Sequence, residues 1–79
     1  MDLTQLEIGQ NARIVEIRGG RTIQKKLHDI GIVPGRTIEK SSQTLLRGPV
    51  VLAVGTIQVA IGFGMARKIL VDPLNSLVR

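Results

Sequence analysis

The 79-residue sequence contains no cysteine and only one aromatic residue, Phe63. Without cysteine the chain forms neither disulfides nor thiolate metal sites, as is typical of a reducing compartment. Proline-rich peptides bind grooves lined with aromatic side chains, and proteins that bind single-stranded RNA usually stack bases on such side chains. One phenylalanine cannot build either surface, which disfavours both kinds of recognition.

Long apolar runs are also absent. The longest, residues 50–54, is far below the roughly 18 residues that a membrane-spanning helix needs. Met1 is followed by an acid, Asp2, and the apolar core of a signal peptide does not follow. We therefore expect a soluble, cytoplasmic protein, and the length allows one domain with a small core.

Acidic residues are few, with six against eleven basic ones and a formal charge of +5. Such a surplus favours an anionic partner, which could be a nucleic acid, an acidic protein face or lipid headgroups. The densest basic group comprises Arg18, Arg21, Lys25 and Lys26. A solvated helix face, which needs no partner, is the more common explanation of such a group.

The sequence also lacks the motifs of enzymes and cofactor sites. Its acids are scattered, no serine lies in a nucleophile elbow, and Gly62-Phe63-Gly64 lacks the Lys-Ser/Thr of a phosphate-binding loop. The single histidine, His28, has no companion ligand, because Asp29 points about 100° away around a helix. We expect no catalytic residues, no cofactor, no small-molecule substrate and no protein-built metal site.

A short helix is predicted over about residues 22–30. Ile23, Leu27 and Ile30 recur at the spacing of one helical face. Thr22 is the predicted N-cap, and Gly31 follows the last apolar position, where helices commonly end in a left-handed residue.

Pro34-Gly35 predicts a type II turn directly after this helix. Proline presets φ at the first corner, and glycine accepts the positive φ of the second corner.

Five short strands are predicted around this helix, over residues 12–17, 36–41, 50–54, 57–61 and 68–71. Gly55-Thr56 fits the type II′ turn of a hairpin, and residues 62–66 form a short turn. Near the start, Thr4-x-x-Glu7 has the pattern of a capping box.

These elements predict a mainly β fold, a small SH3-like barrel of about five antiparallel strands, since closure removes exposed edges. The predicted domain covers residues 1–73, and residues 74–79 are expected to form a loose C-terminal tail. Its predicted core is Ile14, Ile17, Leu27, Ile30, Ile38, Val50, Leu52, Val59, Ile61, Ile69 and Val71.

The order and spacing of several motifs resemble the FeoA family, small cytoplasmic proteins of bacterial ferrous iron uptake. The motifs are Leu3-x-x-Leu6-x-x-Gly9, Gly19-Gly20, Leu27-x-x-Ile30-Gly31-Ile32-x-x-Gly35, Gly48-Pro49-Val50, Ala60-Ile61 and Ala66-x-x-Ile69-x-Val71. They cover about residues 3–72. Met65 and Lys26 depart from the family's usual residues.

The resemblance implies an SH3-like fold and a non-enzymatic accessory role, by binding to FeoB, the membrane GTPase transporter for ferrous iron. The membrane would then be reached only through this partner. The candidate contact is Lys25, Lys26, His28, Val33, Pro34 and Gly35. Two alternatives remain: a small basic nucleic-acid-binding barrel, which the missing aromatics disfavour, and a stand-alone relative of the SH3-like module of metal-dependent repressors.

Overall fold

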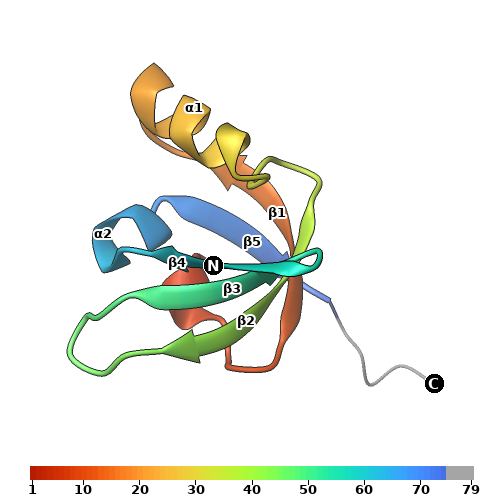
Figure 1. The fold of residues 1–79 in the computed structure, drawn as a ribbon, viewed down its shortest axis with the longest axis vertical. Coiled ribbons are helices and arrows are strands. Elements are labelled where there is room, and N and C mark those ends of the chain that lie inside the picture. Colours follow the sequence, from red (N-terminus) through yellow and green to blue (C-terminus); the bar gives the residue numbers. More distant parts are fainter. Residues whose placement is uncertain (75–79) are drawn as a thin grey trace.

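The computed structural model describes residues 1–74, which form one bent antiparallel sheet with two α-helices and a short 3₁₀ helix (Figure 1). The elements are η1 (Leu3–Gln5), β1 (Asn11–Ile17), α1 (Arg21–Asp29), β2 (Thr37–Gln43), β3 (Val50–Val54), β4 (Ile57–Ile61), α2 (Phe63–Ala66) and β5 (Ile69–Pro73). Most of the predicted tail, residues 75–79, lies outside the described residues. No helix within residues 1–74 is long and apolar enough to cross a membrane.

The strand order is β4-β3-β2-β1-β5. The mainly β prediction of five antiparallel strands with a short helix over about residues 22–30 is confirmed, and β3 and β4 have the predicted bounds. A second helix, α2, lies where a short turn was predicted over residues 62–66. The sheet does not close through hydrogen bonds, because β4 and β5 are its two ends and α2 connects them. Helix α1, which follows β1 and precedes β2 in the chain, projects beyond one end of the sheet (Figure 1).

The N-terminal turn is real, but its predicted cap is wrong. Asp2, rather than Thr4, caps η1: its carboxylate accepts from the backbone N–H of Thr4 at 2.8 Å. The side chain of Gln5 in turn accepts from the N–H of Asp2 at 2.9 Å. The capping box therefore begins two residues earlier than its sequence pattern suggests.

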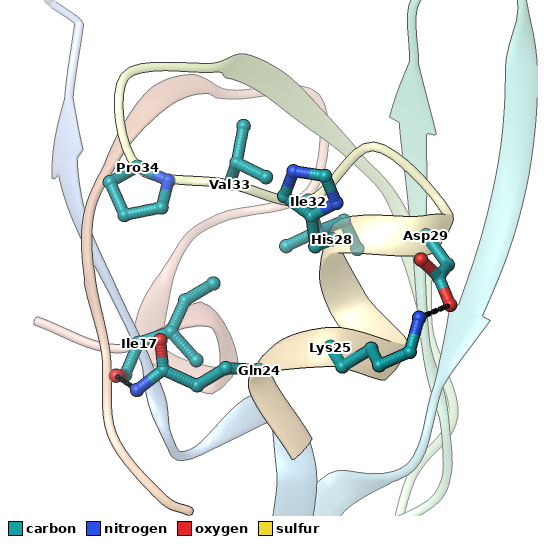
Figure 2. Close-up of a pocket in the computed structure, with 8 residues that line it drawn as sticks. All are labelled: Ile17, Gln24, Lys25, His28, Asp29, Ile32, Val33 and Pro34. Atoms are coloured by element: carbon teal, nitrogen blue, oxygen red, sulfur yellow. Dashed lines mark hydrogen bonds and ion pairs between the residues drawn. The ribbon is translucent and has the colours of Figure 1, made fainter. Parts of the chain in front are cut away.

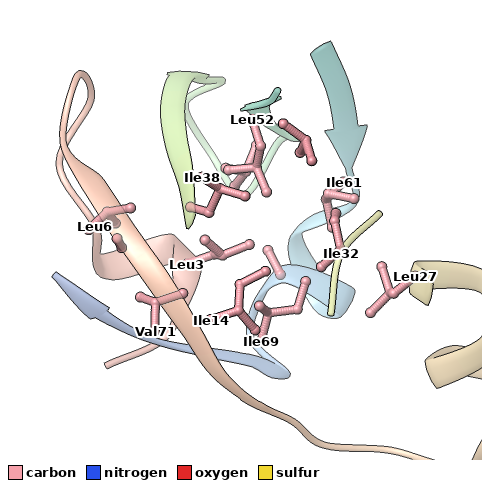
Figure 3. Close-up of a cluster of buried hydrophobic side chains, with 14 of the residues drawn as sticks. Leu3, Leu6, Ile14, Leu27, Ile32, Ile38, Leu52, Ile61, Ile69 and Val71 are labelled. Atoms are coloured by element: carbon pink, nitrogen blue, oxygen red, sulfur yellow. The ribbon is translucent and has the colours of Figure 1, made fainter. Parts of the chain in front are cut away.

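The core lies inside the bent sheet, closed by η1, α2 and the segment after α1 (Figure 3). Nine of the eleven predicted core residues are buried. Val59 only packs against the cluster while partly buried, and Ile30 is wrong, with 38% of its surface exposed. The core also contains six residues that were not predicted: Leu3, Leu6, Ala12, Ile32, Val54 and Ala66.

One charged side chain, Lys40, lies in this interior on β2, only 1% exposed. Its ammonium donates to three backbone carbonyls around η1, those of Leu3 at 3.0 Å, Thr4 at 3.3 Å and Leu6 at 2.6 Å. Burial lowers the pKa of Lys40 below its ordinary value, while the nearby carboxylate of Asp2 acts in the opposite direction. Lys40 thus fastens the N-terminal segment to the sheet.

Candidate functional site

Helix α1 begins at Arg21 and is anchored to β1 by one of its own side chains. Its N-cap is Gly20, which has extended backbone angles and no side chain to cap with, so the prediction of Thr22 is wrong. The amide nitrogen of Gln24 donates to the carbonyls of Ile17 at 3.2 Å and Gly19 at 3.3 Å. These bonds hold the middle of α1 against the end of β1.

The C-terminal end of α1 is a Schellman motif, which redirects the chain into the core. The N–H of Ile32 donates to the carbonyl of Leu27 at 2.8 Å, and the N–H of Gly31 to that of His28 at 3.0 Å. Gly31 has φ of +88°, as the motif requires. Leu27 and Ile32 are both fully buried, so Ile32 takes the inward place that periodicity had assigned to Ile30.

The turn at residues 33–36 follows directly and is fixed to the sheet. Gly35 has φ of +93°, and the N–H of Arg36 donates to the carbonyl of Val33 at 3.1 Å, as expected for a type II turn. The N–H of Gly35 donates to the carbonyl of Ile14 at 2.7 Å. Both the helix and the turn are therefore tied to β1.

An open groove lies between α1, the end of β1 and this turn (Figure 2). Its cavity volume is about 470 Å³. We call it the α1 groove; its lining residues are Ile17, Gln24, Lys25, His28, Asp29, Ile32, Val33 and Pro34. Ile17 and Ile32 are buried at its base and Val33 is half-buried, while the polar members are exposed at its rim.

Four of the six predicted contact residues line the α1 groove, namely Lys25, His28, Val33 and Pro34. Lys26 is exposed on α1 and Gly35 is exposed in the turn, but neither belongs to the lining. Sequence reasoning missed the other four lining residues. The signal for Ile32 was the position of an apolar residue directly after a C-terminal glycine, which a Schellman motif buries.

The rim of the α1 groove carries charges of both signs. The ammonium of Lys25 lies 3.4 Å from a carboxylate oxygen of Asp29, one helical turn further on, and both side chains are more than half exposed. Such exposed pairs contribute little to stability. An apolar base with a charged rim is the chemistry of a peptide or protein contact surface.

Residues 1–74 contain no group of three or more His, Cys, Asp or Glu side chains placed to hold a metal ion. The α1 groove itself offers one imidazole and one carboxylate, and that carboxylate is already paired with Lys25. The expectation that the chain has no metal site stays a prediction.

The fold defines a small SH3-like domain. FeoA of Stenotrophomonas maltophilia, described as an SH3 domain protein and solved with zinc, matches with a TM-score of 0.73 at 21% identity, over 91% of this chain and 89% of that chain. The family model for the FeoA domain matches residues 1–73. The chain belongs to the FeoA family.

A second solved structure supports this assignment. It is a crystal structure of an iron uptake regulatory protein, FeoA, with 32% identity and a TM-score of 0.84, covering 94% of this chain and 96% of that chain. Comparison with the curated proteins gives no match.

Metal-dependent repressors contain the same fold. A manganese-dependent transcriptional repressor matches with a TM-score of 0.85 at 19% identity, over 94% of this chain but only 41% of that chain. At this identity the likeness concerns the fold alone.

Proposed function

We propose that this protein is a non-enzymatic accessory protein of bacterial ferrous iron uptake that binds FeoB, the membrane GTPase transporter, from the cytoplasmic side. Membership of the FeoA family supports this role. So do the descriptions of two relatives, one as an iron uptake regulatory protein and the other as a candidate activating factor of ferrous iron transport.

The contact with the transporter is the α1 groove. The observation that carries this proposal is that one groove unites residues from both halves of the predicted contact, Lys25 and His28 from the helix and Val33 and Pro34 from the turn. The backbone bonds of Gly31 and Gly35 hold the two halves in place. A rigid, partly apolar groove can bind a partner segment at little cost in ordering.

The charges of Lys25, at its rim, and of Lys26, beside it, would act mainly on the association rate. Lys25 and Lys26 are exposed, and exposed charges steer encounter more than they add to the final affinity. Their effect should fall with salt, because the Debye length is about 8–10 Å at moderate ionic strength. Binding to an acidic face of the transporter is therefore expected to weaken as salt rises.

A pull-down with the intact transporter and with its soluble GTPase domain, at two salt concentrations, tests the proposal. The variant Lys25→Glu/Lys26→Glu is expected to lose retention while keeping its fold. A matched control is Arg47→Glu/Arg67→Glu, which changes the net charge equally but lies outside the α1 groove. Equal loss in both variants would show that total charge, rather than this surface, governs binding.

The same proteins discriminate against the nucleic-acid alternative. Generic duplex DNA or RNA is expected to bind only in the non-specific range, with Kd of about 10⁻⁴ to 10⁻⁶ M at physiological salt. Nanomolar binding to a nucleic acid, without retention of the transporter, would reverse the assignment.

A further inference from the structure

The outer edge of β4 is an end of the sheet with exposed hydrogen-bonding groups. β4 pairs along its whole length with β3, and no other strand follows it in the sheet. Among the described residues no backbone hydrogen bond joins β4 to any other segment. The opposite end of the sheet differs, because Met1 and Asp2 lie along the outer edge of β5. The N–H of Val71 donates to the carbonyl of Met1 at 2.8 Å, and Asp2 forms an isolated antiparallel β-bridge with Leu70.

The register of the hairpin identifies which groups of β4 point outward. Gly55-Thr56 links the strands, so that Val54 and Ile57 form the closing pair, which in a two-residue hairpin exchanges hydrogen bonds. Bonded and non-bonded pairs then alternate along the strand. The N–H and C=O groups of Gln58 and Ala60 therefore point away from β3, and both residues are exposed.

This edge lacks the features that usually protect an exposed strand. Proteins prevent edge pairing with charged side chains, prolines or β-bulges. Residues 57–61 include neither a charged residue nor a proline, and their register with β3 is continuous. Ile57 is also 53% exposed, so an apolar side chain lies beside the unpaired backbone.

We propose that β4 pairs with β4 of a second copy of this chain, antiparallel and centred on Val59. The sequence Ile57-Gln58-Val59-Ala60-Ile61 is nearly palindromic. In this register Gln58 of one copy faces Ala60 of the other, so their outward groups form four hydrogen bonds. Ile57 faces Ile61, and Val59 faces itself, as a two-fold axis requires.

Net charge opposes self-association, and it opposes it least where the contacting strand itself carries no charge. Two chains of net charge +5 repel each other, and β4 is a strand without charge. The residues from 41 to 71 contain no acid either, so this part of the surface offers little to a cationic partner segment. The contact is small, which predicts a weak, concentration-dependent dimer.

Sedimentation equilibrium and amide NMR spectra over a concentration series test this inference. The wild type is expected to associate as the concentration rises towards about 1 mM, which corresponds to weak affinity. The amide signals of Gln58 and Ala60 should shift with concentration, while those of α1 remain unchanged. This measurement on the wild type needs no variant to fold.

A proline substitution then tests the edge itself. Ala60→Pro removes an outward N–H, which an edge strand tolerates, and is expected to abolish association. Ala60→Ser keeps this N–H and is expected to associate like the wild type. A wild type that stays monomeric up to about 1 mM would overturn the inference, as would association of Ala60→Pro equal to that of Ala60→Ser.

A further outcome separates this inference from the transporter contact. If the wild type is monomeric and Ala60→Pro loses retention by the transporter, then β4 binds the partner and not a second copy. That result would overturn the dimer, whereas failure of the dimer alone would leave the role of the α1 groove unaffected.

Discussion

Replacing Lys40 by methionine is expected to destabilise the fold markedly, although the two side chains are similar in length. The substitution removes three donated hydrogen bonds and leaves their carbonyls behind. The bonds to Leu3 and Leu6 are buried, whereas that to Thr4 is only partly buried. The carbonyl of Leu3 also accepts from the backbone N–H of Leu6 at 3.3 Å, so the carbonyl of Leu6 is the buried acceptor that loses its only donor among the described residues.

The expected loss follows chiefly from the carbonyl of Leu6, since that of Leu3 keeps one donor. Each buried acceptor without a donor costs about 1–3 kcal/mol, and relief of the desolvation of the ammonium offsets part of this cost. We expect Lys40→Met to lower the free energy of unfolding by about 1–3 kcal/mol, a substantial part of the roughly 5–15 kcal/mol typical of a domain.

Urea denaturation of the variant beside the parent measures this loss. Lys26→Met is the matched control, because Lys26 is exposed and its substitution should change stability by less than about 0.5 kcal/mol. A denaturation midpoint of Lys40→Met equal to that of the parent would refute the claim that Lys40 fastens η1 to the sheet.

Four further outcomes are expected. Burial lowers the pKa of Lys40 in the folded protein below its ordinary value of 10.5. Between the folded-state pKa and 10.5, the unfolded chain therefore binds more protons than the folded chain. The unfolding free energy of the parent should rise with pH in this range, and that of Lys40→Met should not. Leu27→Ala, at a fully buried position, should cost about 2–5 kcal/mol by urea denaturation; an unchanged midpoint would exclude Leu27 from the core. Gly35→Val should cost about 1–3 kcal/mol through its positive φ alone, since a Cβ there meets no neighbouring atom within 4 Å, and Gly35→Asn should cost less; equal midpoints would contradict this backbone explanation. Anaerobic calorimetry with ferrous iron should detect no stoichiometric site of micromolar or tighter affinity, and such a site would instead support a metal-carrying role.

The sheet was largely predictable because its signals are local. Alternating β-branched residues and the Gly55-Thr56 link predict the β3–β4 hairpin with its correct bounds. The glycines at the end of α1 and in the following turn predict backbone conformations that the structure shows, with φ of +88° at Gly31 and +93° at Gly35. In each case one residue type fits one backbone geometry.

The errors arise where burial depends on contacts between residues distant in sequence, or on the way the backbone ends a helix. Lys40 is buried because carbonyls more than thirty residues away accept its ammonium, and no local pattern indicates such an arrangement. Ile30 continues the apolar period of α1, yet the Schellman motif turns the chain and buries Ile32 instead. The same turn forms one wall of the α1 groove, which explains why only part of that groove could be predicted.

Amide chemical-shift mapping tests the central claim most directly. The labelled chain would be titrated with the soluble GTPase domain of the transporter and then with the intact transporter. The account predicts that the signals of residues 24–35 shift or broaden on binding, and that those of the β2–β3 connection do not. Binding that perturbs other surfaces and leaves residues 24–35 unchanged would contradict the account.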